Sequence, residues 1–379
     1  MLFILAVTLS ILACDAEDTA PTPRPTPTTD PNAQPRSFHL GFTPFPYDIS
    51  LGAVNFTYER LAIDSDIVAH HFDDGVPWPE ALSGDPYSKN LQDDWETRKE
   101  KTPPGHKVYV AITPIRLTRD GLALYRGDEG SQPLPPPWDT YDFNHPDVKS
   151  AYLNHLLRAV EFFEPDYLAI GIEVNLLLDS VPEQWDAYME LHTFIYTELK
   201  GRYPNLPIFA SVSGNALLEG YRDIDNAPAN LEAFKELLPY TDYYAISLYP
   251  FLGAKFLEGI PDDMFEKLLS LSDKPIAFAE TGYPAETLSL YNGAVTWESD
   301  PQKQLDYFSM LLEEADKRDF VFVINFVLRD YDRLWEKLDD PEMINLARIW
   351  RDTGFYDQDG YPRPVLDLWR EMLARPVGD

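Results

Sequence analysis

The chain has 379 residues, a length that suits one large domain with terminal tails, and its formal net charge is −32. This charge disfavours nucleic acid, anionic membrane surfaces and strongly acidic polysaccharides as partners. Hydrophobic residues make up 44% of the chain and aromatic residues 13%, which is enough to fill a sizeable core.

Residues 1–14 predict a lipoprotein-type signal peptide. The apolar run from Met1 to Ala13 is too short to span a bilayer, and Ile11-Leu12-Ala13-Cys14 resembles a bacterial lipobox, whose cysteine becomes lipidated. Cys14 is the only cysteine of the sequence, so no internal disulfide can form. Because no Lys or Arg precedes the run, an ordinary secretory signal or a start farther upstream stays an alternative.

Residues 15–36 predict a disordered, extended tether. The segment holds six prolines among Thr, Asp and Ala, a composition that cannot form a core and favours polyproline-like conformations. Such a tether would hold the following domain away from a membrane. We expect membrane contact only through the lipid on Cys14. The expected location is therefore extracytoplasmic, either anchored to a bacterial membrane or secreted.

From residue 37 to residue 379, predicted strands and helices alternate, which indicates an α/β fold with a parallel sheet and crossover helices. Each predicted strand is a short apolar run followed by turn residues. Eight such runs are present, which predicts a single-domain (β/α)8 TIM barrel. The predicted strands cover residues 38–44, 66–72, 107–114, 166–175, 207–215, 243–250, 274–284 and 320–328.

The intervening helices follow from apolar spacing and proline positions. Apolar residues recur at helical spacing in 147–163, and proline opens the first turn of 182–199 and 301–315. The helices after strands one and two are the least clear, and the one after strand two is the better defined. The loop 116–143 is long and rich in Pro and Gly, and a barrel loop of this length usually shapes the substrate cleft. Shorter helices are predicted at 90–101, 230–238 and 262–271.

Two of the apolar runs end in a glutamate, Glu173 after strand four and Glu280 after strand seven. These strands face each other across the mouth of an eight-stranded barrel, so we expect the two carboxylates to meet there. A retaining glycosidase uses one acid that protonates the leaving oxygen and one carboxylate that attacks the anomeric carbon, about 5–5.5 Å apart. We assign Glu173 as the acid/base and Glu280 as the nucleophile.

The arrangement resembles glycoside hydrolase clan A, whose barrels carry the acid/base on strand four and the nucleophile on strand seven. Ile170-Gly-Ile-Glu-Val-Asn175 resembles the Gly-Asn-Glu-Val/Ile motif of the endo-β-1,4-galactanases (arabinogalactanases). Ala279-Glu-Thr-Gly-Tyr-Pro284 is similar to their nucleophile strand, and residues 300–304 and 353–364 also look like that group. The resemblance spans residues 38–373. It implies a retaining glycoside hydrolase that acts on a neutral polysaccharide or oligosaccharide by double displacement.

One position departs from the clan A pattern. These enzymes usually carry Asn immediately before the acid/base Glu, where it binds the sugar 2-hydroxyl, whereas this chain has Ile172. A hydrogen bond that strengthens in the transition state is therefore missing. Either another group such as Asn215 replaces it, or the substrate makes no such demand, or the activity is low.

Polar and aromatic residues near the predicted strand ends are candidates for sugar binding. Aromatic rings bury the apolar face of a sugar and leave its hydroxyls to polar neighbours. A strand-six tyrosine in clan A often hydrogen-bonds the nucleophile, which implies this role for Tyr249. For each aromatic residue a place in the core is the alternative. The candidates are His71, Asp74, Trp78, Asn215, Tyr249, Trp297 and Phe326, with Trp138 as a further aromatic residue.

We expect neither a cofactor nor a metal. The sequence has no nucleotide-binding glycine fingerprint, no His-x-x-x-His pair and no second cysteine. His70 and His71 are adjacent in a strand, so their rings face opposite sides of the sheet. The expected partner is a carbohydrate substrate, and we expect a monomer that binds no nucleic acid. Arg329 and Asp330 are expected to form a salt bridge that closes the barrel.

Two other interpretations stay open. In the first, the chain is a non-catalytic, glycan-binding barrel lipoprotein. Ile172 favours it. For the glutamates themselves, the alternative is that one or both are structural and pair with Arg116 or Arg329. In the second, the chain is a different barrel enzyme or a solute-binding lipoprotein, which a separation of the glutamates beyond about 9 Å would indicate.

Overall fold

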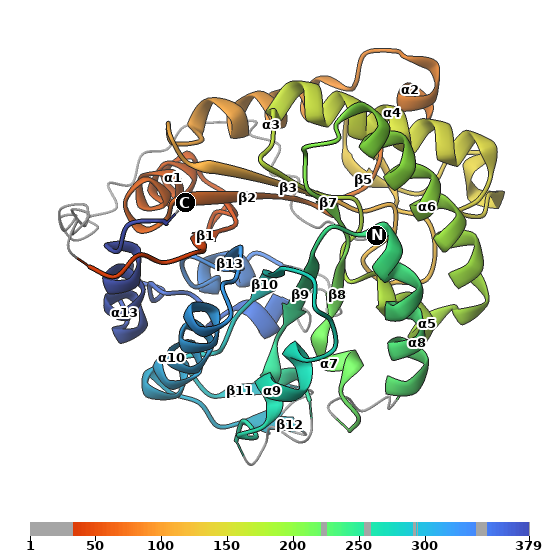
Figure 1. The fold of residues 1–379 in the computed structure, drawn as a ribbon. Helices are drawn as coiled ribbons and strands as arrows, with labels where there is room; N and C mark the ends of the chain where they lie inside the picture. Colours follow the sequence, from red (N-terminus) through yellow and green to blue (C-terminus); the bar gives the residue numbers. More distant parts are fainter. Residues whose placement is uncertain are drawn as a thin grey trace.

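The computed structural model describes residues 33–220, 226–253, 259–290, 293, 295–338 and 347–378. Parallel strands lie at its centre and helices surround them (Figure 1). The predicted signal segment with Cys14, and the tether up to residue 32, lie outside the described residues. Within these described ranges, no helix is long and apolar enough to cross a membrane.

The parallel sheet closes into a barrel. Its hydrogen-bonded order begins with β7 (Ile208–Phe209) and ends with β8 (Ser211–Ser213), and these are consecutive pieces of one run that is interrupted at Ala210. The predicted (β/α)8 barrel is therefore confirmed. Between these pieces the order is β6 (Tyr167–Ala169), β3 (Lys107–Ile112), β2 (Ile67–Phe72), β1 (His39–Phe42), β13 (Phe322–Asn325), β10 (Ile276–Thr281) and β9 (Tyr244–Leu248).

The predicted helices are present, with ends shifted by a few residues. The structure adds α1, the unclear helix, and α13, which the sequence pattern did not indicate. At the start of α1 the Ser50 side chain accepts a hydrogen bond from the Ala53 N–H at 3.2 Å, a cap worth about 1 kcal/mol. The longer helices are α1 (Leu51–Asp64), α3 (Lys89–Lys101), α4 (Pro146–Phe163), α6 (Trp185–Arg202), α8 (Ala227–Leu237), α10 (Pro301–Lys317) and α13 (Pro364–Leu373).

Short elements occupy several connections between the barrel strands. The long loop after β3 contains an antiparallel hairpin, and a second hairpin follows β10. The hairpin strands are β4 (Tyr125–Gly127) with β5 (Gly130–Gln132), and β11 (Leu288–Leu290) with β12 (Val295–Trp297). The short helices are α2 (Trp78–Ser83), α5 (Leu177–Ser180), α7 (Gly214–Leu217), α9 (Met264–Leu269) and α11 (Asp332–Trp335).

Small and aromatic side chains fill the interior of the barrel. The Tyr109 ring packs against Phe209 and Phe322, with centroid distances of 5.6 and 5.0 Å. Successive strand residues point to opposite faces, so Ile67 and Ala69 share the interior face with His71 farther along β2. The barrel is therefore a packed core whose inward rows end at the mouth.

The two ends of the described chain lie together. Arg36 is buried, its backbone pairs with Val377, and its Nη2 donates to Asp66 Oδ2 at 2.6 Å. The last residues assigned to the tether are thus held by the barrel. The C-terminal helix α13 packs against α10 beside them (Figure 1).

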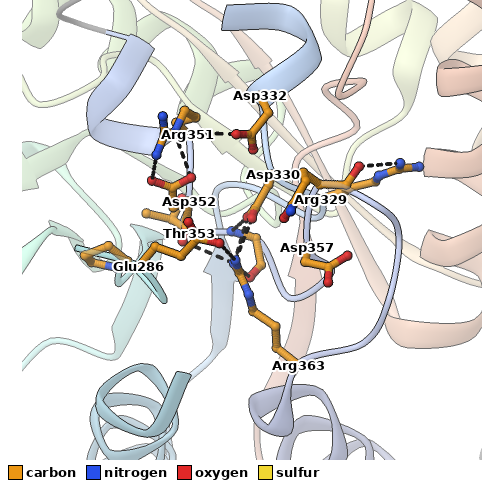
Figure 2. Close-up of polar contacts among 12 residues, drawn as sticks. Glu286, Arg329, Asp330, Asp332, Arg351, Asp352, Thr353, Asp357 and Arg363 are labelled. Carbon is orange, nitrogen blue, oxygen red and sulfur yellow. Dashed lines mark hydrogen bonds and ion pairs between the residues drawn. The ribbon is translucent and has the colours of Figure 1, made fainter. Parts of the chain in front are cut away.

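A buried cluster of charged side chains joins the loop after β13 to the segment before α13 (Figure 2). Arg363 donates to both carboxylate oxygens of Asp330, at 2.8 and 2.6 Å, and to Glu286 Oε1 at 3.2 Å. Asp330 thus pairs with Arg363 rather than with Arg329, whose Nη2 donates to the Gln358 carbonyl at 2.8 Å. The expected Arg329–Asp330 bridge is wrong, because Arg329 turns toward the opposite side (Figure 2).

The same cluster contains carboxylates close enough to share a metal ion, from Glu286, Asp330 and Asp352. Among these described residues, the Arg363 guanidinium already lies between Asp330 and Glu286 and supplies positive charge there.

Arg363→Met is expected to destabilise the fold by about 3–5 kcal/mol, because it leaves the buried Asp330 carboxylate unpaired. Urea unfolding followed by circular dichroism measures this loss. The double variant Arg363→Met/Asp330→Asn removes that buried charge and should regain part of the lost stability. Lys235→Met breaks an exposed helix pair and should change stability by less than about 1 kcal/mol. A loss for Arg363→Met as small as that of Lys235→Met would contradict the assignment.

Candidate active site

Glu173 and Glu280 line one cavity at the barrel mouth. The cavity has a volume of about 130 Å³. Apolar and aromatic side chains form most of its wall, and its polar groups are few. Its lining includes Phe45, His71, Asp73, Leu117, Arg119, Ile172, Glu173, Glu280, Phe326, Tyr331 and Trp350.

A β-bulge turns Glu280 toward this cavity. Along β10, Phe278 pairs with Ile246, but the next pair is Glu280 with Ser247, so Ala279 is an extra residue. Strict alternation from the interior residues Ala277 and Ala279 would point Glu280 outward. The bulge shifts the register, so that the Glu280 side chain points inward like that of its pairing partner Ser247.

An irregular backbone turns Glu173 toward the same cavity. After β6 the chain leaves the strand, and Glu173 has φ +46° and ψ +45°, in the left-handed region that is uncommon for residues other than glycine. Its N–H donates to Ser211 Oγ at 2.9 Å, which fixes this conformation. Such conformations cluster at functional sites, where the surrounding structure holds them.

Two donors hold the carboxylate of Glu280. His71 Nε2 lies 3.1 Å from Oε1, and Tyr249 OH donates to Oε2 at 3.2 Å. Burial raises the pKa of Tyr249 well above its ordinary value, and the nearby charges of Glu280 and Glu173 raise it further. Tyr249 therefore stays a donor throughout the accessible pH range.

His71 carries positive charge more readily than an ordinary histidine. Burial lowers the pKa of its imidazole, but the carboxylates of Glu280 and Asp73 raise it, and the net direction is above the ordinary value of 6.5. The ring packs edge-on against Phe326 at 5.5 Å between centroids, which fixes its orientation.

His71→Gln is expected to lower the free energy of unfolding by about 1.5–3 kcal/mol near pH 6, because it removes a charged hydrogen-bond donor from the buried Glu280. The raised pKa means that this contribution is fully present below pH 6.5 and is lost as the pH rises through that pKa. Denaturant unfolding of both proteins between pH 5 and pH 9 measures the difference. His106→Gln, which lies outside the site, is the control. A His71→Gln effect that grows with pH would contradict this sign.

Two donors also hold Glu173. Arg119 Nη2 donates to Oε2 at 2.9 Å and Ser247 Oγ donates to Oε1 at 2.8 Å. Arg119 is nearly buried, and its own backbone is left-handed with φ +56°. Both oxygens of Glu173 are therefore occupied by protein donors in this conformation.

The predicted structural partners of the glutamates were Arg116 and Arg329, and neither fills that role. Arg116 pairs with Asp120 inside the loop after β3. The Arg329 guanidinium stacks on Tyr47 with its carbon 3.6 Å from the ring centroid. The arginine that pairs with Glu173 is Arg119.

Three of the predicted substrate-binding residues meet at the cavity. His71 and Phe326 line it, and Tyr249 reaches it through Glu280. Asn215 supports Tyr249 instead of facing a sugar: its side chain exchanges hydrogen bonds with the Tyr249 backbone N–H and carbonyl, at 3.2 and 3.0 Å. It therefore does not replace the amide that is absent at Ile172.

The other three predicted substrate-binding residues lie elsewhere. Asp74 pairs with Arg126 at 2.5 Å and lines a larger groove beside the cavity, not the cavity itself. Trp78 is completely buried, stacks on Trp138 and donates to the Ala123 carbonyl at 2.8 Å, so it has no face for a sugar. Trp297 is buried in the β11–β12 hairpin.

Several cavity residues were not identified from the sequence. Arg119 lies in the long loop after β3, which was expected to shape the cleft, and no sequence pattern distinguishes it from Arg116 in the same loop. Ser247 is one residue inward of the β9 end, where strand periodicity places it beside Glu280. Trp350 and Tyr331 come from the segment after β13, where the apolar residues follow neither a helical nor a strand pattern that would indicate an element.

No family model and no curated protein matches the chain by sequence. Two solved structures have the same fold, each with a TM-score of 0.57: an exo-β-1,4-mannosidase from an Opitutaceae bacterium, strain TAV5, and xylanase 10B from Thermotoga maritima. The identities are 13% and 12%, and each match covers 89% of this chain. The chain spans 59% of the mannosidase and 95% of the xylanase. At the level of the fold, therefore, the chain is a barrel of the kind found in these two glycosidases, as the predicted clan A resemblance implies.

Proposed function

We propose that the chain is a retaining glycoside hydrolase of a neutral polysaccharide or oligosaccharide, with Glu280 as nucleophile and Glu173 as acid/base. The observation that carries the proposal is the pair of glutamates, from two non-adjacent barrel strands and their ends, that line one cavity. Glu280 in particular is oriented by His71 and Tyr249. The two glycosidases that share the fold support a glycan as substrate class.

In the first step a Glu280 oxygen attacks the anomeric carbon, the bond to the leaving oxygen breaks, and Glu173 gives that oxygen its proton. In the second step Glu173 takes a proton from water, the water oxygen attacks the anomeric carbon, and the ester bond to Glu280 breaks. His71 and Tyr249 keep the attacking carboxylate in one orientation through both steps, which is the positioning contribution of the protein.

A polysaccharide screen combined with covalent labelling tests this proposal. Galactans, arabinogalactans, mannans and β-glucans are incubated with the protein and the products are sized. A 2-deoxy-2-fluoro-glycosyl fluoride of the sugar that is released should then inactivate the enzyme. Peptide mass spectrometry should find the label on Glu280. Labelling of another residue would overturn the assignment.

A second function, glycan binding without catalysis, is favoured by the Arg119–Glu173 ion pair. Acid catalysis requires a Glu173 oxygen that is free to present a proton, so Arg119 has to move or yield to the substrate. Ile172 in place of the usual amide points in the same direction. Calorimetry with galactan, mannan and xylan oligosaccharides separates the two functions. Binding without any product after long incubation would select the second one.

We also propose that the protein acts outside the cytoplasm, attached through a lipid on Cys14. Cys14→Ser in the full chain, expressed in a bacterium, is expected to move most of the protein from the membrane fraction to the soluble fraction, because the proposed lipid on this cysteine is the attachment. Fractionation with immunodetection measures this. An unchanged distribution would contradict the lipid anchor.

A further inference from the structure

A groove larger than the cavity lies beside the cavity with the two glutamates. It has a volume of about 810 Å³ and is formed by the long loop after β3, the loop after β2 and Gln184 ahead of α6. Asp73 and Leu117 line both the groove and the cavity, so the two spaces are adjacent. A ligand held in the cavity can therefore extend into the groove.

The wall between the two spaces is held in place by local hydrogen bonds. The Arg116 N–H donates to the Gly121 carbonyl at 3.1 Å, and Arg116 Nη2 donates to the Asp120 carbonyl at 2.8 Å. Between them the chain turns back so that the Arg119 N–H donates to the Arg116 carbonyl at 2.8 Å. This turn places Leu117 in the lining of both spaces and brings Arg119 onto Glu173.

The groove has the surface that a neutral glycan chain binds. Hydroxyl and amide groups from Ser131, Gln132 and Gln184 lie among the apolar faces of Leu134 and Tyr141. Sugar rings are amphipathic, so a lining with both kinds of group suits several consecutive rings.

The charges of the groove exclude an acidic chain. Its cationic lining residue, Arg116, is paired with Asp120, and Asp74 is paired with Arg126. Asp139 and Asp142 also line the groove and form no ion pair within the described part of the chain. Uronic acid units would therefore meet uncompensated carboxylates there.

We propose that the groove binds sugar units of a neutral glycan chain beyond the reacting ring, so that the enzyme selects an extended glycan over a monoglycoside. The inference rests on the proposed function, in which the reacting ring lies in the cavity with Glu173 and Glu280. The groove, at about 810 Å³, is far larger than the cavity that holds the reacting ring, so it accommodates more than one further unit.

Thr140→Trp and Gln184→Trp test the groove from two separate segments, since both residues line it and neither lines the cavity. For the wild type, kcat/KM should rise from disaccharide to hexasaccharide of the glycan found in the screen. In each variant, kcat/KM on the hexasaccharide should fall about tenfold or more, while kcat/KM on the para-nitrophenyl monoglycoside stays within about twofold. Thr197→Trp, on the exposed side of α6, is the matched control.

Equal losses on both substrates, or no loss on the hexasaccharide, would overturn the groove assignment and leave the hydrolase intact. If the wild type cleaves no glycan and no aryl glycoside, the proposed function fails by itself. Calorimetry with galactan, mannan and xylan hexasaccharides then tests whether the groove binds a glycan. Binding that Thr140→Trp abolishes and Thr197→Trp preserves supports it, and any other result rejects it.

Discussion

Glu280→Ala is expected to lower kcat by about 10³-fold or more on every substrate that the wild type hydrolyses, because no covalent glycosyl intermediate can form. The cavity that the missing carboxylate leaves has two donors, His71 and Tyr249, which suit a small anion. Added azide should therefore enter it and attack the anomeric carbon. The product should be a glycosyl azide whose configuration is inverted relative to the substrate.

Initial rates and proton NMR of the azide product measure both outcomes. Glu313→Ala, which removes an exposed carboxylate from α10, is the matched control and should keep the wild-type rate. A Glu280→Ala protein that hydrolyses at the wild-type rate would exclude Glu280 as nucleophile. Activity lost without an azide product, in a protein that is still folded by circular dichroism, would leave Glu280 a structural role only.

Glu173→Ala is expected to lower kcat/KM by about 10²- to 10⁴-fold on substrates whose leaving group is a sugar, because that oxygen then departs without a proton. With a dinitrophenyl glycoside, the rate of this first step should fall only slightly, because dinitrophenolate departs as an anion and needs no proton. The second step becomes slow, and azide should accelerate it to give a glycosyl azide of retained configuration.

The dependence of the rate on the leaving group distinguishes this role from a structural one. Arg119→Met removes the cationic partner of Glu173 but leaves the Glu173 carboxyl group in place. If Glu173 is the acid/base, the rate of this variant should depend on the leaving group as the wild-type rate does. Ser211→Ala removes the hydroxyl that fixes the Glu173 backbone and should lower kcat with little change in that dependence. Equal losses of Glu173→Ala on activated and natural substrates would show that Glu173 acts only in binding or folding.

The Arg119–Glu173 pair decides between the two functions considered for this chain. In the hydrolase, Arg119 and Ser247 orient the carboxyl group until a substrate displaces one of them. In a binding protein the same pair is permanent, and the cavity only holds a sugar ring against Phe326 and Trp350. The leaving-group experiments above report on this difference directly.

The fold could be predicted from the sequence, because each barrel strand is a continuous apolar run and such runs need no distant partner to be recognised. Residues 208–213 show where this prediction stops. The apolar pattern indicates one strand, whereas the structure has two, β7 paired with β6 and β8 paired with β9, with a break at Ala210. The C-terminal helix α13 was not identified, although its buried residues Val365, Leu366 and Trp369 lie on one side. Its contact with α10 depends on residues far away in the sequence.

For the candidate site, the apolar runs predicted that Glu173 and Glu280 end two barrel strands. The clan A resemblance implied a hydrogen bond from Tyr249 to Glu280, and His71 was predicted to bind substrate. Strand ends in a parallel barrel converge at one mouth wherever the helices lie. The folded structure was needed to show that both carboxylates point inward. That result depends on the extra residue in β10 and on the left-handed backbone of Glu173, which alternation along a strand does not encode. It also decided the partner of Glu173, because Arg119 is separated from it by 54 positions along the chain and meets it only when the barrel closes.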